Sequence, residues 1–418
     1  MNIVIKTLGC KANRYESNKI QDAFEGKHLV IDAGSGQLKH ADLIVVNTCT
    51  VTHVADRKSR QAISHFKKLY PDAKVIVFGC GSNVNPEGYK KHPNVNYVVK
   101  ETDELIKLVE KLAKDHKAPC DHSLMPQNRT RTLIKIQDGC NNFCSYCIVP
   151  FARGREKSKP VYEIIEEATQ KVSKRFKEIV LTGINIGTYN DNNHDLAELI
   201  EKILNDTQIK RLRLSSIEPQ NFSNKFLKLL EDPRFCPHLH ISLQSGCDEI
   251  LKNMRRRYDT KMFKQMIESL RKAVPHISIT TDLIIGFPGE TEGHFIETVN
   301  FIKKIKFSKI HIFPYSKRKG TLAADMPEQI SDNIKKERCT FLSALEKQMR
   351  MDFYHKNIGR SDSVLIEKID KNGNAIGFTS NYLKTRTPTG IQNNANEIIH
   401  LRLDKVTDEI EMIGSLKT

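Results

Sequence analysis

Short apolar runs alternate with amphipathic stretches over residues 1–125. The runs at 2–7, 42–47 and 74–78 predict β-strands, and the stretches at 13–24 and 55–69 predict helices between them. The strand runs are apolar throughout rather than at every second position, which is typical of strands covered on both faces. We therefore predict a parallel sheet with helices on both sides.

A cysteine follows each of these three strands: Cys10, Cys49 and Cys80. The carboxyl ends of parallel strands share one edge, where ligands bind, so we expect the three thiols to meet there. Lone cysteines are most often ordinary buried thiols. The repeated pattern of strand and then cysteine favours instead three ligands of an iron–sulfur cluster. Four other cysteines show no such pattern and are interpreted as packing residues: Cys120, Cys236, Cys247 and Cys339.

The alternation of strands and helices returns over residues 126–355. Strands are predicted at 133–136, 178–181, 211–214, 238–243, 278–285 and 309–313. Proline at position 160 is interpreted as the first turn of one of the intervening helices. Six units are too few for a full eight-stranded barrel, so we predict a partial (βα)6 barrel.

Residues 356–418 change character, with short strands expected at 364–367, 375–379 and 398–403, separated by Gly, Asn and Thr turns. A small antiparallel barrel fits this pattern, and such barrels bind RNA or serve as structural caps. The predicted fold class is therefore α/β. It comprises an N-terminal parallel-sheet domain (1–125), a partial barrel (126–355) and a small C-terminal β-barrel (356–418).

The strongest chemical signal is the stretch GCNNFCSYC at residues 139–147, just after the first barrel strand. It carries Cys140, Cys144 and Cys147, and no fourth Cys or His lies within the loop. Three thiolates on a cubane cluster leave one of its four irons open to an external ligand. A structural zinc site is the alternative, but zinc normally takes four protein ligands close together. The spacing favours a [4Fe-4S] cluster.

Polar and glycine-rich turns follow several predicted barrel strands, at residues 182–187, 215–219, 242–246 and 286–290. Each alone is more often a plain turn. In a barrel all four would ring one mouth, which favours a cofactor pocket around the cluster.

Composition restricts the class of protein but does not by itself indicate a function. The chain has 418 residues, ten cysteines and a formal net charge of +16, with a pI near 9.3. The positive charge favours binding to a polyanion such as nucleic acid. A solvated Lys-rich surface without such a partner explains the charge equally well. No apolar run is long enough to span a bilayer, and the N-terminus opens on a strand rather than a signal peptide. We therefore expect a cytoplasmic protein with reduced thiols and no membrane partner.

The whole chain resembles the methylthiotransferase family of radical S-adenosylmethionine enzymes. The resemblance covers a methylthiotransferase N-terminal domain, a radical-enzyme partial barrel and a C-terminal TRAM domain, which binds RNA in this family. The matching stretches are 8–10, 47–49, 78–80, 139–147, 153–156, 215–219, 243–246 and 313–316. One departure is Cys247, where serine is expected after the Gln-Ser-Gly turn; its thiol is a possible stray ligand.

The resemblance implies two [4Fe-4S] clusters and S-adenosyl-L-methionine as cofactors. Cys140, Cys144 and Cys147 would bind the radical cluster, and Cys10, Cys49 and Cys80 an auxiliary cluster that carries the transferred sulfur. One S-adenosylmethionine would supply methyl, and a second the radical that activates the adenine C2–H. The candidate cofactor contacts are Gly183, Asn185, Gly187, Ser216, Glu218, Gln244, Arg153 and Arg155. An electron donor such as flavodoxin and a source of sulfur are the further partners implied.

Within the family, residues 47–61 and 254–258 resemble the tRNA branch that converts N6-threonylcarbamoyladenosine, next to the anticodon, to its 2-methylthio form. The partner would then be the anticodon stem-loop of tRNA. Arg or Lys would hold the carboxylate of that base, and the candidates are Arg57, Lys58, Arg255 and Arg257. The same side chains suit tRNA phosphates. Alternatives are a sister enzyme acting on isopentenyladenosine in tRNA or on a ribosomal protein aspartate, and a zinc-bearing RNA-binding protein.

Overall fold

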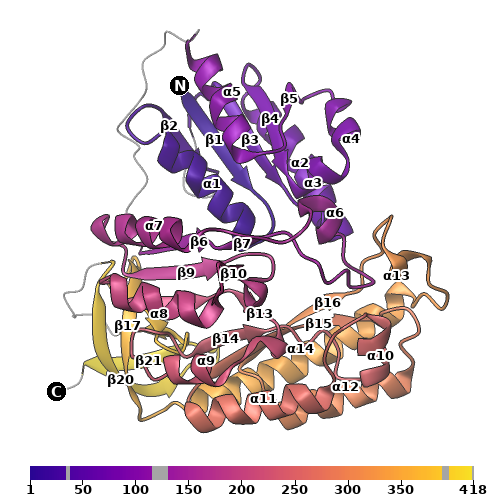
Figure 1. Cartoon of the computed structure of the whole chain (residues 1–418), viewed down its shortest axis with the longest axis vertical. Coiled ribbons are helices and arrows are strands. Elements are labelled where there is room, and N and C mark those ends of the chain that lie inside the picture. Colours follow the sequence, from indigo (N-terminus) through magenta and orange to yellow (C-terminus); the bar gives the residue numbers. More distant parts are fainter. Residues whose placement is uncertain (34–37, 115–129, 388–394, 417–418) are drawn as a thin grey trace. The chain divides into compact units, whose positions relative to one another are not determined.

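A computed structural model of the chain describes residues 1–33, 38–114, 130–387 and 395–416 (Figure 1). It divides into two compact units. The first comprises Met1–Gln127, Asp138–Glu156 and Ser316–Ala324, and the second comprises Asn128–Gln137, Lys157–Tyr315 and Asp325–Thr418. Both cysteine sets therefore belong to the first unit, although the 139–147 loop lies within the predicted barrel segment. The three-part division of the sequence stays a prediction, and its boundary near residue 125 lies outside the described residues.

The first unit is built on a five-stranded parallel sheet of order β2-β1-β3-β4-β5. Its strands are β1 (Asn2–Thr7), β2 (Leu29–Asp32), β3 (Leu43–Thr48), β4 (Lys74–Gly79) and β5 (Tyr97–Val98). Its helices are α1 (Lys11–Ala23), α2 (His53–Leu69), α3 (Cys80–Val84), α4 (Pro86–Lys90), α5 (Thr102–Lys114) and α6 (Val149–Arg153). In this order the direction of strand addition reverses between β1 and β3, and ligands bind at the carboxyl ends on either side of such a switch point.

Both faces of this sheet are buried, as the continuous apolar runs predict. Ile3 and Ile5 of β1 pack with residues of α1 and α5 on one face, and Val4 packs with residues of α2 on the other. Figure 1 shows helices along both faces of this sheet. The two buried layers hold the strands rigidly, so the loops at their carboxyl ends start from fixed positions.

The second unit contains six main parallel strand segments that follow one another in sequence, counting the adjacent β12 and β13 as one, in two sheets of order β12-β9-β6 and β13-β14-β15-β16. These strands are β6 (Arg131–Lys135), β9 (Glu178–Thr182), β12 (Arg211–Leu214), β13 (Ser216–Ile217), β14 (His238–Ile241), β15 (Ser278–Ile285) and β16 (Lys309–Pro314). Leu212 of β12 forms an isolated parallel bridge to Phe235, just before β14. The predicted partial barrel is therefore present, open rather than closed by eight strands.

Helices cover one face of these strands, and one apolar core lies between the helices and the strands. The helices are α7 (Val161–Ser173), α8 (Leu196–Asp206), α9 (Asn224–Leu229), α10 (Asp248–Asn253), α11 (Thr260–Ala273), α12 (Glu292–Ile305) and α14 (Asp332–His355). The remaining short elements are β7 (Gln137–Asp138), β8 (Lys157–Ser158), η2 (Ile186–Thr188), β10 (Asn190–Asp191), β11 (His194–Asp195), η3 (Pro219–Asn221) and α13 (Leu322–Asp325).

The C-terminal residues of the second unit form a closed five-stranded barrel of order β17-β18-β19-β21-β20. Its strands are β17 (Ser361–Ile369), β18 (Ala375–Thr379), β19 (Lys384–Arg386), β20 (Ile398–Val406) and β21 (Met412–Leu416). The predicted α/β fold class is confirmed, including this small barrel. Sequence periodicity missed β2, β5, β19 and β21, which are short or have mixed polarity. Pro160 is the N-cap of α7 rather than part of its first turn, with ψ of 139°.

A buried charge cluster joins the C-terminal barrel to the amino-terminal ends of the parallel strands. Glu178, at the start of β9 and 1% exposed, lies 3.1 Å from Arg211 and 3.4 Å from Arg213. Tyr382, from the C-terminal barrel, donates a hydrogen bond to Glu178. The guanidinium of Arg213 lies over the ring of Tyr382, 4.0 Å from the ring centroid. Burial raises the pKa of Glu178, but Arg211 and Arg213, with the hydrogen bond from Tyr382 and the charge of Arg131, together hold that pKa below its ordinary value.

Replacing Glu178 by alanine should lower the free energy of unfolding by about 3–5 kcal/mol, because two buried arginines lose their counter-ion. The matched control is Glu201→Ala, whose carboxylate is 48% exposed and pairs with Lys225 at the surface. That change should cost less than about 1 kcal/mol. Urea unfolding of the full chain measures both, and equal costs would show that the cluster does not hold the barrel in place.

No helix in the described part of the chain is both long and apolar enough to cross a bilayer.

Candidate functional site

The three cysteines of the first set lie at the carboxyl edge of the first unit's sheet, as the strand pattern predicts. Cys10 is the N-cap of α1 after β1, Cys49 follows β3, and Cys80 begins α3 directly after β4. The Oδ1 atom of Asn13 accepts hydrogen bonds from the Sγ atoms of Cys10 and Cys80, at 3.7 and 3.8 Å. Gly9 has a φ of +96°, and a Cβ there would lie 2.9 Å from the Sγ of Cys49. The positions on either side of the β1/β3 switch point thus both carry a thiol.

Burial differs among the three thiols, and it raises the pKa of the two that are buried. Cys10 is exposed, whereas Cys49 and Cys80 are about 5% and 4% exposed. Burial raises the pKa of Cys49 and raises that of Cys80 to about 12; Arg153 opposes this, and the neighbouring thiols add to it. Thiolates at this site therefore need positive charge beside them, and bound metal ions supply such charge.

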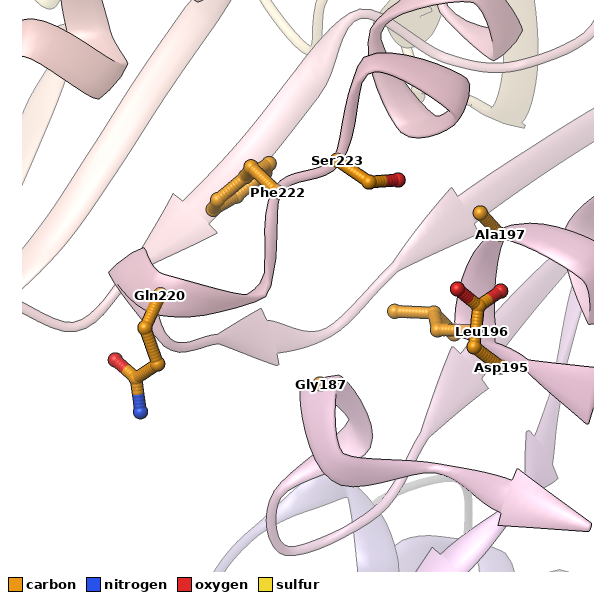
Figure 2. Close-up of a pocket in the computed structure, with 7 residues that line it drawn as sticks. All are labelled: Gly187, Asp195, Leu196, Ala197, Gln220, Phe222 and Ser223. Atoms are coloured by element: carbon orange, nitrogen blue, oxygen red, sulfur yellow. The ribbon is translucent and has the colours of Figure 1, made fainter. Parts of the chain in front are cut away.

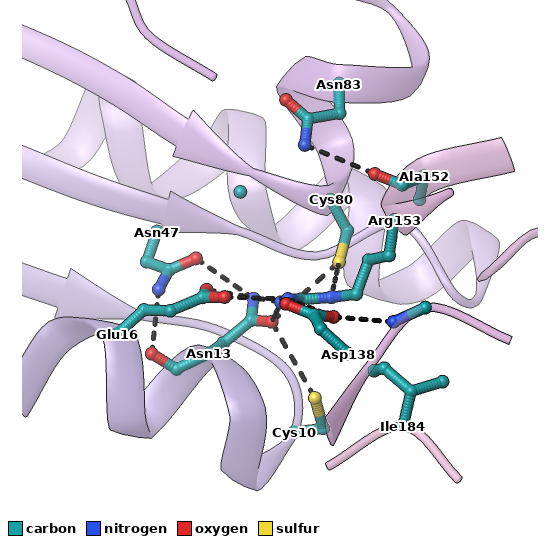
Figure 3. A network of polar contacts seen from close by, with 12 residues as sticks. Cys10, Asn13, Glu16, Asn47, Cys80, Asn83, Asp138, Ala152, Arg153 and Ile184 are labelled. Atoms are coloured by element: carbon teal, nitrogen blue, oxygen red, sulfur yellow. Dashed lines mark hydrogen bonds and ion pairs between the residues drawn. The ribbon is translucent and has the colours of Figure 1, made fainter. Parts of the chain in front are cut away.

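Arg153 supplies a positive charge beside Cys80 (Figure 3). Its side chain is 7% exposed, and its Nε donates to the Sγ of Cys80 at 3.1 Å. One terminal nitrogen lies 2.7 Å from Glu16 and 3.2 Å from Asp138, and the other donates to Asn13. Every nitrogen of the guanidinium is thus engaged within the first unit. The structure thus places Arg153 beside the first cysteine set, and its predicted contact with S-adenosylmethionine stays a prediction.

Asparagine side chains complete the same network. Asn13 donates from its Nδ2 to the Oδ1 of Asn47 at 3.0 Å and to the carbonyl of Thr48 at 2.9 Å. Asn47 returns a bond from its Nδ2 to the carbonyl of Asn13 at 2.8 Å. Figure 3 shows these groups around Arg153, with Asn83 donating to the carbonyl of Ala152 at 3.2 Å. This reciprocal bonding fixes the start of α1, which carries Cys10.

The second set, Cys140, Cys144 and Cys147, lies on a loop that folds back on itself before α6. The amide of Cys140 donates to the carbonyl of Gly154 at 3.2 Å, and that of Cys147 donates to the carbonyl of Cys144 at 3.0 Å. Gly139 has a φ of +71°, and a Cβ there would lie 2.0 Å from the carbonyl oxygen of Arg155. Only glycine allows this close approach. The three thiols are partly exposed, and none of the nine described cysteines is in a disulfide.

Three soft thiol donors on a loop with partial exposure fit a [4Fe-4S] cluster with one open iron. The first set offers three thiols in the same way, two of them shielded from water, next to a buried cation. Hydrogen bonds to cluster sulfurs and ligands are a means by which proteins tune such clusters. The chemistry of both donor sets therefore fits the clusters that the sequence predicts.

Buried polar atoms without partners mark the carboxyl ends of β9 and β12 in the second unit. Among the described residues, Oγ1 of Thr182, Oγ of Ser215 and both side-chain polar atoms of Asn185 have no hydrogen-bond partner. Asn185 is 4% exposed, and its backbone amide donates to Oε1 of Gln137 at 2.8 Å. Buried polar groups in native proteins are normally satisfied, so such a group of orphans points to a polar ligand. S-adenosylmethionine, with its amino, carboxylate and ribose groups, is a ligand of that kind.

Three other predicted cofactor contacts, Glu218, Gln244 and Ser216, lie in the second unit, and a fourth, Arg155, lies in the first. Glu218 is held on both oxygens, by Arg256 at 2.6 Å and by Gln220 at 3.2 Å. Gln244 adopts a φ of +69°, in a turn bridged to β15. Ser216 is partly buried on β13. Arg155, in the first unit, is exposed and packs its guanidinium 4.5 Å from the ring centroid of Phe143. The cofactor roles of these four residues stay predictions.

A cavity of about 230 Å³ adjoins the rim and is lined by one predicted contact, Gly187 (Figure 2). The other lining residues are Asp195, Leu196, Ala197, Gln220, Phe222 and Ser223. Asp195 and Ser223 already accept hydrogen bonds from the first turns of α8 and α9 as their N-caps. The cavity therefore extends the rim rather than forming a separate site.

All four predicted substrate cations are exposed: Arg57 and Lys58 on α2, and Arg255 and Arg257 after α10. Arg256, which the sequence did not single out, is the buried member of its arginine run, because a φ of +58° at Arg255 turns the chain there. Exposed cations suit phosphate contacts. The roles of all four stay predictions.

The packing interpretation holds for the three remaining cysteines that the structure describes. Cys236 and Cys247 are buried, and Cys339 lies partly buried on α14. Burial raises the pKa of the Cys247 thiol to about 11, with a hydrogen bond to Glu297 adding to the shift. Cys120 lies outside the described residues.

Comparisons with known proteins agree with these features. Residues 134–302 match the radical SAM superfamily, and residues 2–100 match the Uncharacterized protein family UPF0004. The chain is 37% identical over 91% of its length to the threonylcarbamoyladenosine tRNA methylthiotransferase MtaB of Bacillus subtilis, covering 89% of that relative. It is 34% identical to the MtaB of Thermotoga maritima, over 97% of this chain and 95% of the relative.

More distant relatives include a tRNA-2-methylthio-N(6)-dimethylallyladenosine synthase of Thermodesulfovibrio yellowstonii, which is 31% identical over 96% of both chains. Among solved structures, the radical S-adenosylmethionine methyltransferase TsrM of Kitasatospora setae matches with a TM-score of 0.55 and 15% identity. That match covers 78% of this chain and 77% of TsrM, and it supports the fold alone. With relatives at this identity over nearly the whole chain, and a radical SAM domain between 134 and 302, the chain belongs to the methylthiotransferase family of radical S-adenosylmethionine enzymes.

Proposed function

We propose that this protein adds a methylthio group to C2 of N6-threonylcarbamoyladenosine next to the anticodon of tRNA. The observation that carries the proposal is the similarity, over 91% and 97% of the chain, to relatives named for that base. The formal net charge of +16 suits an RNA substrate. The C-terminal barrel and the exposed cations of α2 are the surfaces we assign to tRNA.

In this proposal the two cysteine sets have separate roles. Cys140, Cys144 and Cys147 hold a [4Fe-4S] cluster whose open iron takes S-adenosylmethionine. Cys10, Cys49 and Cys80 hold a second [4Fe-4S] cluster, from which the sulfur comes. When bound, these groups supply the radical and the sulfur, so the chain needs no acid–base pair of its own for the transfer.

The protein side chains hold and shield these groups. Asn185, Thr182 and Ser215 offer buried donors and acceptors for the polar parts of S-adenosylmethionine. Arg153 is the cation beside the first set, and its charge stabilises the thiolate of Cys80. An electron donor of the flavodoxin kind and an external sulfur source complete the requirements.

Deletion of the gene tests the function in the cell. Nucleosides from tRNA of the deletion strain should lose 2-methylthio-threonylcarbamoyladenosine and accumulate the unmodified precursor, as measured by mass spectrometry. Restoring the gene should restore the product. An unchanged level would refute the proposed base, and loss of the 2-methylthio derivative of dimethylallyladenosine instead would assign the protein to the sister activity.

A further inference from the structure

The segment 316–324 follows the last strand of the second unit, β16, but belongs to the first unit. Arg318 in this segment donates from its Nη2 to Oγ1 of Thr50 at 2.5 Å, and Thr50 directly follows a cysteine of the first set. The amide of Ala323 donates to the carbonyl of Ser145 at 2.8 Å, within the loop that carries the second set. The segment is therefore attached beside both cysteine sets, although it is remote from them in sequence.

The guanidinium of Arg318 has no counter-ion in the part of the chain that the structure describes. Its side chain is partly buried, and its one hydrogen bond there goes to the hydroxyl of Thr50. The Nε atom is buried without a hydrogen-bond partner. The Nη1 atom is not buried and has no partner among the described residues, so it is available to a ligand.

This unpaired state is exceptional among the arginines of the protein. Of the described arginines that are not exposed, all but Arg271 and Arg318 form an ion pair with a carboxylate. Arg271 instead donates its two terminal nitrogens to the carbonyls of Ile305 and Lys306, at 2.6 and 2.7 Å, where α12 ends. Shielded charges in proteins are normally paired, so Arg318 is suited to an anion from outside the chain.

The surroundings of Arg318 indicate which anion it takes. A guanidinium binds carboxylate and phosphate oxygens alike. Lys317 and Lys319 flank Arg318, and both are exposed. Three successive cations suit a polyanion with repeated charges better than a single carboxylate. In the proposed function the target base receives sulfur at the first cysteine set and is activated by the radical formed at the second. The phosphates on either side of that nucleotide therefore come close to both sets as well.

We propose that Arg318 binds a tRNA phosphate next to the target nucleotide and so anchors that nucleotide beside the two cysteine sets. Thr50 is the positioning residue, because its hydroxyl holds the guanidinium. The inference rests on the proposed function, since it takes tRNA as the substrate. It adds the segment 316–324 to the surfaces that contact tRNA.

The test measures the affinity of full-length protein with both clusters for tRNA that carries threonylcarbamoyladenosine, without S-adenosylmethionine. Arg318→Gln should weaken binding by about tenfold at low salt, because one charged hydrogen-bond donor is lost. It should also reduce the slope of log Kd against log salt concentration by about one. Arg318→Lys keeps the charge and should recover part of both. The matched control, Arg271→Gln, makes the same change of charge and should leave both unchanged.

A second tRNA, with plain adenosine at the same position, distinguishes a phosphate from the carboxylate of the threonylcarbamoyl group. A phosphate contact predicts that Arg318→Gln loses the same factor in affinity for both tRNAs. A loss confined to the tRNA with threonylcarbamoyladenosine would assign Arg318 to the carboxylate and overturn the inference.

Iron content and tRNA-independent formation of 5′-deoxyadenosine separate a tRNA contact from a role toward the clusters or the cofactor. Arg318→Gln should keep about eight irons per chain and the wild-type KM for S-adenosylmethionine. Loss of iron, or a raised KM with unchanged tRNA affinity, would overturn the inference. An unchanged salt slope in Arg318→Gln with its full iron would also overturn it and leave the proposed function standing. Wild-type protein whose tRNA binding depends on Arg318, yet which forms no 2-methylthio product, would refute the proposed function alone.

Discussion

Replacing Arg153 by alanine is expected to abolish methylthio transfer and to lower the free energy of unfolding by about 3–5 kcal/mol. The side chain is buried, and its removal takes an ion-pair partner 2.7 Å away from Glu16, which is 10% exposed. It also removes the Nε donor from the Sγ of Cys80 at 3.1 Å and the partner of Asn13. The first cysteine set therefore loses both its adjacent positive charge and part of its scaffold.

Arg153 is a positioning residue in this account, so its test needs measurements besides activity. Iron content should fall by about four atoms per chain if the first set no longer retains a cluster. Arg153→Lys should recover part of the stability, since the charge returns, but a lysine cannot reproduce the planar fork that reaches Cys80, Glu16 and Asn13 together. It should therefore recover little of the transfer activity.

The control for Arg153 is Arg60→Ala, in the same unit. Arg60 is 47% exposed and pairs with Asp56 one turn away on α2. Its removal should cost less than about 1 kcal/mol and leave the iron content unchanged. A full complement of iron and normal transfer in Arg153→Ala would contradict the assignment of Arg153 to the first cysteine set.

The second large effect is expected from Cys49→Ala. Wild-type protein prepared without oxygen should hold about eight irons per chain, and this variant about four, because one of two four-iron clusters loses a ligand. Methylthio transfer should disappear, while cleavage of S-adenosylmethionine to 5′-deoxyadenosine continues on the other set. Methylthio transfer is lost and 5′-deoxyadenosine formation is kept because the two cysteine sets have separate roles.

Cys247→Ser is the matched control for Cys49→Ala. Cys247 is equally buried, at 2% exposure, but belongs to neither set and lies in the second unit. Its iron content and activity should equal those of wild type. Transfer that survives in Cys49→Ala would remove the first set from the reaction, and zinc without sulfide in the wild-type protein would make the zinc-bearing alternative the correct one.

The gathering of the first cysteine set could be predicted from sequence because it depends on a repeated local pattern. Each strand is a short apolar run, and each cysteine follows within three residues of its end. Parallel packing then brings Cys10, Cys49 and Cys80 to one edge, whatever the helices between them do. The loop spacing of the second set is likewise local, so its three thiols could be identified directly.

Arg153 could not be assigned from sequence because its partners are remote. It lies six residues after Cys147, which suggested the same cofactor, yet its Nε contacts Cys80, separated by 73 positions. Arg256 was missed for a related reason: in a run of three arginines only the backbone turn at Arg255 decides which side chain is buried.

The central claim, that this chain methylthiolates threonylcarbamoyladenosine, is tested most directly by mass spectrometry of nucleosides. Anaerobically prepared protein would be incubated with S-adenosylmethionine, a reductant and tRNA carrying either threonylcarbamoyladenosine or dimethylallyladenosine. The account predicts the 2-methylthio product from the first tRNA and almost none from the second. Unchanged threonylcarbamoyladenosine, from protein that holds about eight irons and forms 5′-deoxyadenosine, would contradict it.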